Sequence, residues 1–448
     1  MKKKSFTAAA LMLALTLTVS LIAGCSSNNN SGKASSAAPS SAAPSGESKA
    51  PVDDKPVNLT FWYALSGANG EAFKAMIDEF NSSQSRITVE AVFSGSYADT
   101  ATKMATALAS KTEPNGALMG AGPLYTGPQN NTSILEMLEG DADFKMDDIY
   151  DGMWNYSKYN GKIVSIPYNI STQLIYYNAD ILKAAGIDVN QPPRTWDELL
   201  AYAKKAQADG NINKSNDFWG LDTSDSPWLF KSMLMQNGNS VVENVDGVAN
   251  PLFENAEGVE TAEFWHKLVD EGVMPAGQHD LSENKFLAGN LAMIAATSAR
   301  MSKWSSGQQF EVGAFALPSR QKPAVALGGG VLVQFNKSER ENQATYELIK
   351  FLMDKDRATN FSLKTGYMPI YRSALEMADT QKTMGENPMY QVAFNQLGSS
   401  TAYWHFDDMG TMDFMIYEAL EKIEKGDQKP ADAMKSLSEG LKTEMGVK

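Results

Sequence analysis

The sequence predicts an α/β protein with two lobes, and three observations carry this prediction. Residues 57–91 have the pattern of strand, helix and strand, because apolar residues alternate at both ends and recur at helical spacing between them. Residues 57–448 are enough to bury two separate cores. Residues 166–199 lead a polar stretch into a buried strand, which is typical of a chain that crosses between lobes.

The first strand, helix and strand indicate where a ligand would bind. Residues 57–61 and 87–91 alternate between apolar and polar side chains, and residues 73–80 have helical spacing. This order predicts a parallel βαβ unit with a right-handed crossover, and ligands meet such sheets at the carboxyl ends of the strands. The loops in that position are residues 62–70, 94–99 and 120–127.

The crossing segment combines polar side chains with a core strand. Tyr168 and Asn169 come just before the apolar run at residues 174–177, whose length and aromatic content predict a buried strand. Thr195 and Glu198 then form the pattern of a capping box, which predicts that a helix opens at this point.

The N-terminus has the features of a processing signal. Three lysines precede an apolar run at residues 8–22, and small residues lead to Cys25. We therefore expect residues 1–24 to be a lipoprotein signal peptide and Cys25 to carry the lipid; an uncleaved membrane anchor is the alternative. Residues 25–56, rich in Ser, Ala, Asn and Pro, are expected to be the lipidated N-terminus and a flexible linker.

Charge and cysteine content exclude several classes of function. The formal net charge is −14, and loss of residues 1–24 would make it −17, which argues against nucleic acid as a partner. Cys25 is the only cysteine, so no intramolecular disulfide can form. We also expect no cofactor and no metal, because the Asp141 to Lys145 stretch lacks the glycine and the ligand spacing of a calcium loop.

No motif for catalysis is present. The chain has three histidines and lacks the usual zinc, nucleophile-elbow and nucleotide-binding motifs. A glycoside-acting enzyme needs only two carboxylates, so the 53 acidic residues leave that class open. A structural adhesin is a third class, and it predicts that no small ligand stabilises the protein.

Several motifs resemble, in order, the solute-binding proteins of bacterial ABC importers, closest to the branch that binds glycerol-3-phosphate. Residues 167–196 contain Pro-Tyr-Asn, Ser-Thr, Tyr-Tyr-Asn, Ala-Gly and Gln-Pro-Pro-Arg-Thr-Trp. Residues 364–370 read Lys-Thr-Gly-Tyr-Met-Pro-Ile, residues 328–330 are three glycines, and residues 21–25 resemble a lipoprotein box. Such spaced motifs are more specific than one short motif.

The resemblance implies a two-lobed periplasmic-binding-protein fold of type II, in which a sheet flanked by helices forms each lobe and three segments form the hinge. The crossings are expected at residues 167–172, 283–294 and 333–337. Lobe 1 would comprise residues 57–168 and 298–334, and lobe 2 residues 169–297 and 335–448.

The resemblance also implies the residues that contact ligand. Tyr97 follows a Gly-Ser pair in a strand-end loop, Trp228 would be a stacking platform, and Tyr367 lies in the Lys-Thr-Gly-Tyr motif, whereas Trp219 is expected in the core. Ser298 would cap a helix or face the ligand. The cluster at residues 404–407 departs from the family but would add a stacking ring and hydroxyl acceptors. The complete set is Tyr97, Asn169, Ser171, Trp228, Ser298, Gly329, Tyr367, Trp404, His405 and Asp407.

Departures from the glycerol-3-phosphate branch favour another ligand. Gly122 stands where that branch has a glutamate, and His405 stands where it has an arginine for the phosphate. We therefore expect a neutral sugar or short oligosaccharide. Glycerol-3-phosphate or an acidic sugar is the alternative, and Arg300 is the residue that would favour it.

Together these features predict a carbohydrate receptor that is not an enzyme. It would be a lipid-anchored monomer on the outer face of the cytoplasmic membrane, on the extracellular or periplasmic side. Its partners would be a carbohydrate, the transmembrane subunits of an ABC permease, and the membrane through the lipid on Cys25, with no nucleic acid.

Overall fold

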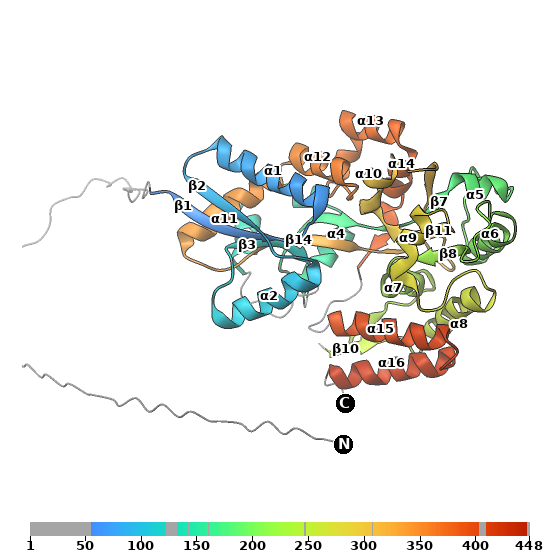
Figure 1. Cartoon of the computed structure of the whole chain (residues 1–448). Helices are drawn as coiled ribbons and strands as arrows, with labels where there is room; N and C mark the ends of the chain where they lie inside the picture. The colour runs from blue at the N-terminus through green and yellow to red at the C-terminus, as the bar shows by residue number, and fades with distance from the viewer. Residues whose placement is uncertain are drawn as a thin grey trace, which may run out of the picture. The chain divides into compact units, whose positions relative to one another are not determined.

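The computed structural model describes residues 55–121, 132–141, 144–159, 161–245, 248–306, 308–402 and 409–445. All of them belong to one compact unit, Asp54–Lys448. Two larger sheets, each flanked by helices, form the framework of this described part (Figure 1). This arrangement is the type II two-sheet α/β architecture that the sequence predicts.

The first sheet contains the predicted βαβ unit. Strands β1 (Val57–Tyr63) and β2 (Ile87–Phe93) are parallel, and α1 (Gly67–Ser83) connects them. Leu59 and Phe61 of β1 are buried, as the alternation predicts. The strand order is β2, β1, β3 (Gly116–Gly120), β14 (Gly328–Gln334) and β6 (Ile166–Ser171).

The second sheet begins directly after the first crossing. Strand β7 (Gln173–Asn178) is the buried run of the crossing segment, and its Tyr176 is fully enclosed. The strand order is β12 (Val312–Phe315), β7, β11 (Leu291–Thr297) and β8 (Trp219–Thr223). Helix α6 (Trp196–Asp209) packs on β8 and opens with the predicted capping box of Thr195 and Glu198.

The later crossings differ from the prediction. The chain stays in the second sheet through β11 and β12, because Phe315 of β12 stacks on Tyr177 of β7 with 4.4 Å between ring centroids. It returns to the first sheet before β14. Residues 312–315, which were expected in lobe 1, therefore pair in the second sheet, whereas residues 328–334 pair in the first sheet as expected.

The segment after β14 also remains with the first sheet, contrary to the expected crossing at residues 333–337. Helix α11 (Glu339–Leu352) packs on β1, and its Phe351 meets Phe80 of α1 with 5.2 Å between ring centroids. Helix α12 (Lys355–Thr365) packs on α1, whereas α14 (Pro388–Asn395) contacts β12. The third crossing therefore lies between α12 and α14.

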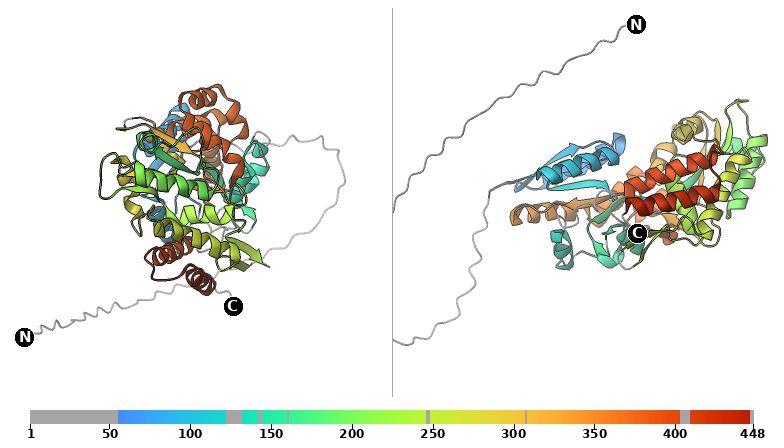
Figure 2. Two further views of the ribbon diagram at one scale, coloured as in Figure 1. Left: turned by 90° about the vertical axis from the view of Figure 1, so that its right-hand side faces the viewer. Right: turned by 90° about the horizontal axis from the view of Figure 1, so that it is seen from below.

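The C-terminal helices α15 (Met409–Glu424) and α16 (Pro430–Glu444) pack on each other and on α8 (Ala256–Asp270) (Figure 2). No helix within the described ranges has both the length and the apolar character needed to cross a membrane. The other elements are α2 (Tyr97–Ser110), α3 (Thr132–Glu139), η3 (Met146–Asp148), α4 (Asp151–Tyr156), β4 (Lys158–Tyr159), β5 (Lys162–Ile163), α5 (Ala179–Ala184), α7 (Ser226–Gln236), β9 (Val242–Val245), β10 (Val248–Pro251), η4 (His279–Leu281), α9 (Ser282–Leu287), η5 (Ser298–Arg300), α10 (Met301–Trp304), β13 (Val325–Ala326), η6 (Arg372–Glu376), α13 (Ala378–Glu386), η7 (Leu397–Ser399) and β15 (Ser400–Thr401).

Candidate functional site

A cavity of about 830 Å³ is lined by residues that come from the elements of both sheets. We call it the cleft. From the first sheet and its connections come Ala64, Leu65, Ser66, Asn69, Tyr97, Ala98, Ala101, Ala105, Gly120, Ala121, Tyr156, Ser171, Gly328 and Gly329. From the second sheet, its helices and the connections come Asp225, Trp228, Lys231, Thr297, Ala299, Arg300, Leu327, Tyr367, Gly410 and Asp413.

Half of the predicted site residues lie in this lining. Tyr97 is the first residue of α2, where the capping box of Ser96 and Asp99 fixes the start of the helix. Tyr367 follows Gly366, whose left-handed conformation ends α12. The predicted residues that the structure brings together around the cleft are Tyr97, Ser171, Trp228, Gly329 and Tyr367.

Asn169 and Ser298 are fully buried and are not among the lining residues. The side-chain nitrogen of Asn169 donates to the Tyr97 hydroxyl over 2.7 Å, so Asn169 lies behind Tyr97. The Ser298 hydroxyl accepts from the backbone N–H of Thr172 over 3.3 Å. Ser298 therefore ties β11 to the first crossing, and the cap of the η5 turn is Thr297.

Four other predicted positions have no structural description. Trp404, His405 and Asp407 lie outside the described residues, as does Cys25. Gly122, which entered the argument about the ligand, lies outside them too.

The three glycines are needed for contacts within the protein. Gly329 has a φ of +97°, and a Cβ atom there would lie 2.1 Å from the backbone oxygen of Asn169. A Cβ atom on Gly328 would lie 2.7 Å from the indole of Trp228. The glycines begin β14 instead of preceding it, and they let Trp228 and Asn169 approach this strand.

Trp228 is held in place by one hydrogen bond from its backbone and one from its indole ring. Its backbone N–H donates to the carboxylate of Asp225 over 2.9 Å, and this bond caps α7. Its indole N–H donates to the backbone oxygen of Ala326 over 3.0 Å. With its polar edge satisfied, the ring presents apolar surface to the cleft.

A group of charged residues in the cleft was missed by the sequence analysis. We call Asp225, Lys231 and Asp413 the cleft cluster. Lys231 has only 4% of its side chain exposed, and its ammonium lies 2.5 Å from the carboxylate of Asp413. The signal was available, because Asp225, Trp228 and Lys231 recur every third residue and so share one face of a helix.

Asp225 and Tyr97 both have raised pKa values. Solvent reaches Asp225, but the cleft walls limit its hydration and raise its pKa, whereas the Trp228 N–H and the Lys231 ammonium lower it. Burial raises the pKa of Tyr97 well above its ordinary value, and the nearby Tyr367 raises it further. The Tyr97 phenol therefore stays neutral at physiological pH.

Arg300 is paired with a carboxylate. Its guanidinium meets the carboxylate of Glu283 through Nε at 2.9 and 3.1 Å. Both side chains are about one third exposed, at 38% and 30%. Each described cation in the cleft lining, Lys231 and Arg300, thus has a carboxylate partner.

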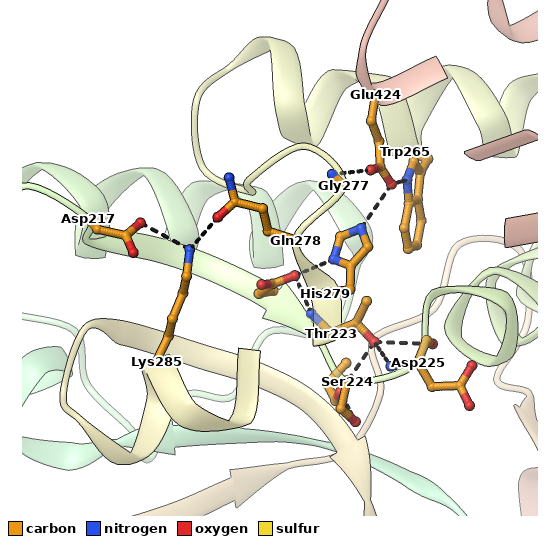
Figure 3. Close-up of polar contacts among 12 residues, drawn as sticks. Asp217, Thr223, Ser224, Asp225, Trp265, Gly277, Gln278, His279, Lys285 and Glu424 are labelled. Atoms are coloured by element: carbon orange, nitrogen blue, oxygen red, sulfur yellow. Dashed lines mark hydrogen bonds and ion pairs between the residues drawn. The ribbon is translucent and has the colours of Figure 1, made fainter. Parts of the chain in front are cut away.

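A second charged group lies behind the cleft wall and is not among the lining residues. We call His279, Asp222 and Glu424 the sealed cluster, because none of these side chains is more than 4% exposed. The His279 ring contacts Asp222 through Nδ1 at 2.6 Å and Glu424 through Nε2 at 3.0 Å (Figure 3). Among the described residues, no group of His, Cys, Asp or Glu is placed to hold a metal ion.

The chain is similar in sequence to a known protein family and to named members of it. The family model described as bacterial extracellular solute-binding protein matches residues 75–386. The sn-glycerol-3-phosphate-binding periplasmic protein UgpB of Escherichia coli O1:K1 is 23% identical over 402 residues, covering 85% of this chain and 91% of that protein.

Solved structures share the fold. The cyclic alpha-maltosyl-1,6-maltose binding protein from Arthrobacter globiformis has a TM-score of 0.73 at 25% identity, covering 87% of this chain and 99% of that one. UgpB from Mycobacterium tuberculosis, in complex with glycerophosphocholine, also has a TM-score of 0.73 at 20% identity, covering 86% and 98%.

Proposed function

The chain belongs to the bacterial extracellular solute-binding proteins, and from this premise we propose that it captures a neutral sugar or short oligosaccharide. Members of this family are the substrate-binding components of ABC importers and not enzymes, so the alternative of a glycoside-acting enzyme is set aside. The narrower proposal concerns the ligand, its contacts and the anchoring of the protein.

One observation carries the choice of ligand. The two described cations of the cleft lining are both paired with carboxylates, Lys231 with Asp413 and Arg300 with Glu283. A dianionic phosphate would have to compete with these partners for a cation. A neutral polyol needs no free cation, because hydroxyl groups bind carboxylate, phenol and backbone oxygens.

Aromatic side chains supply the apolar part of the proposed site. Tyr97, Tyr156, Trp228 and Tyr367 all line the cleft. Aromatic faces cover the apolar side of a sugar ring, while nearby polar groups fix its orientation. We assign ligand contact to Tyr97, Ser171, Trp228, Gly329 and Tyr367, and we place Asn169 behind Tyr97 as its support.

Glycerol-3-phosphate or an acidic sugar is the second candidate. Its support is the similarity to UgpB of Escherichia coli, which binds sn-glycerol-3-phosphate. For this chain, such a ligand would require Arg300 to exchange Glu283 for the anion. Both side chains of the Arg300 pair are about one third exposed, whereas Lys231 is buried, so the Arg300 pair is the one that could exchange.

We further propose that the two lobes close on the ligand and present a closed surface to the permease. The chain crosses between the sheets near Thr172, before β14 and after α12, and a few short connections can absorb such a motion. Cys25 would carry a lipid that holds the monomeric protein at the outer face of the cytoplasmic membrane. Cys25→Ser should release the protein from the membrane fraction; retention would contradict this anchoring.

A thermal-shift screen tests the ligand class. A ligand at one hundred times its dissociation constant adds about 2.7 kcal/mol to the free energy of unfolding. We expect neutral mono- and oligosaccharides to raise the melting temperature. If glycerol-3-phosphate or uronic oligosaccharides alone do so, the neutral-sugar proposal is wrong, and if no solute does, the receptor assignment of this cleft is wrong.

Replacement of Trp228 tests the site itself. Trp228→Ala should weaken binding of the sugar found in the screen by about tenfold, because a stacking contact of about 0.5–1.5 kcal/mol and the apolar area that it covers are lost. Trp219→Phe is the control: Trp219 begins β8, the strand just before α7, its indole donates to Asp217 over 2.7 Å, and it is not in the lining. Equal affinity losses in both variants would contradict the proposed site.

A further inference from the structure

The cleft cluster has an arrangement that bears on selectivity. Asp225, Trp228 and Lys231 come from one face of α7, and all three line the cleft. Asp413 reaches the same place from α15, a helix more than a hundred residues later in the chain. The pairing of Lys231 with Asp413 therefore depends on the tertiary structure.

The two partners of this pair differ in exposure. Lys231 is 4% exposed, whereas Asp413 is 46% exposed. A buried ammonium needs an anionic or hydrogen-bonding partner, since burial without one is strongly unfavourable. A half-exposed carboxylate has no such need, because water solvates it. The contact therefore stabilises the buried lysine more than it stabilises the exposed aspartate.

Asp225 shares the electrostatic environment of this pair. The Lys231 ammonium lowers the pKa of Asp225, while the Asp413 carboxylate raises it, so the three charges interact within the cleft. Asp225 already caps α7 through its bond to the Trp228 N–H. Among the described residues, Asp413 caps no helix and does not belong to the core, and the contact that its side chain makes is the one with Lys231.

We propose that Asp413 is a specificity-determining residue: its carboxylate occupies the Lys231 ammonium and thereby makes the cleft reject phosphate- and carboxylate-bearing solutes. This inference rests on the proposed receptor function of the same cleft. An anionic ligand would have to displace Asp413 from a contact of 2.5 Å and would also meet the charges of Asp413 and Asp225. A neutral polyhydroxylated ligand meets neither obstacle, and its hydroxyl groups can donate to both carboxylates.

Removal of the Asp413 charge should therefore create an anion site. Asp413→Asn keeps the shape of the side chain but leaves the Lys231 ammonium without this counter-ion. We expect the variant to bind glycerol-3-phosphate at least about tenfold more tightly than the wild-type protein, in isothermal titration calorimetry at low salt. The gain should shrink as the salt concentration rises.

Two further variants make this test specific. The double variant Lys231→Met with Asp413→Asn should lose the gain, since it lacks the cation. Glu421→Gln is the matched control on the same helix, because Glu421 pairs with Lys425 at 2.7 Å and is not in the lining. It should not change the affinity for glycerol-3-phosphate.

The outcomes separate the inference from the function on which it rests. If the wild-type protein binds neutral sugars but Asp413→Asn gains no affinity for glycerol-3-phosphate, the inference is overturned and the receptor assignment stands. A gain that survives Lys231→Met would also overturn the inference. If neither protein binds any sugar or polyol, the proposed function fails instead. A single cooperative thermal transition of Asp413→Asn, well above the temperature of the binding measurement, shows that the variant is folded.

Discussion

The cleft cluster and the sealed cluster contain the same kinds of groups but differ in their access to water. In the sealed cluster, His279 lies between Asp222 and Glu424, and Glu424 also accepts from the Trp265 indole over 2.8 Å and the Gly277 N–H over 2.7 Å. In the cleft cluster, Asp413 is 46% exposed. One set of charges is enclosed by protein, and the other has an open side.

This difference separates charges that support the fold from charges that can meet a ligand. The sealed cluster joins β8, η4 and α15, and the chain runs on from β8 through Thr223 and Ser224 to Asp225 in the cleft (Figure 3). The sealed cluster thus supports the two segments that carry the cleft carboxylates. We expect its loss to change stability most, and loss of the cleft cluster to change selectivity most.

The largest expected effect follows from removal of the central imidazole. His279→Ala should lower the free energy of unfolding by about 3–5 kcal/mol, because it leaves two buried carboxylates without their shared partner. Urea denaturation followed by circular dichroism measures this change. Glu421→Gln on α15, the helix that carries Glu424, breaks only a surface pair and should cost less than about 0.5 kcal/mol. A loss in His279→Ala no larger than in this control would show that the cluster is dispensable.

The second effect is a pH dependence of stability. Burial of the imidazole lowers the pKa of His279, but its bonds to Asp222 and Glu424 outweigh burial and raise the pKa from an ordinary value of 6.5 to about 10. The native state then holds one more proton than the unfolded state between these values. The stabilisation is complete below pH 6.5 and is lost as the pH rises to 10, by about 1.4 kcal/mol per pH unit.

The matched measurement compares the wild-type protein with His279→Gln by urea denaturation between pH 6.5 and 9.5. Other groups titrate in both proteins, so the difference between the two curves isolates His279. We expect the difference to narrow as the pH rises. A constant difference across this range would contradict a raised pKa of His279.

The third effect is smaller, because the cleft cluster has an open side. Asp413→Asn should lower the free energy of unfolding by about 1–2 kcal/mol, since Lys231 stays buried but keeps access to the solvent-filled cleft. In a double-mutant cycle, Asp413→Asn should cost less stability in a Lys231→Met background than in the wild-type protein, because no buried cation remains. A cost for Asp413→Asn as large as that for His279→Ala would remove the distinction between the clusters.

The same contrast explains which features could be predicted from the sequence. The strands and helices of residues 57–93, the capping box at Thr195 and the crossing at Thr172 follow from local patterns of apolar spacing and capping. Tyr97, Trp228 and Tyr367 were implied by the family resemblance, and they line one cavity in the structure. Local rules were sufficient for the secondary structure, whereas these ligand residues depended on the resemblance.

Features that depend on distant partners were missed. The pattern of β12 covers only four residues, and nothing within it indicates that it pairs with β7. Helix α11 is evident from its spacing, but the sheet it covers is set by the contact of Phe351 with Phe80. Lys231 and Asp413 are 182 positions apart, so their pairing could not be read from either segment.

The smallest expected effect concerns Arg300, the other cation of the cleft lining. Its pair with Glu283 is about one third exposed on both sides, so water can replace either partner. Glu283→Gln should change the free energy of unfolding by less than about 1 kcal/mol, and this change should decrease further in high salt. If the same variant gains more affinity for glycerol-3-phosphate than Asp413→Asn does, Arg300 is the cation that an anion would reach. Selectivity would then depend on the more exposed pair, and the buried Lys231 would have a structural role like that of His279.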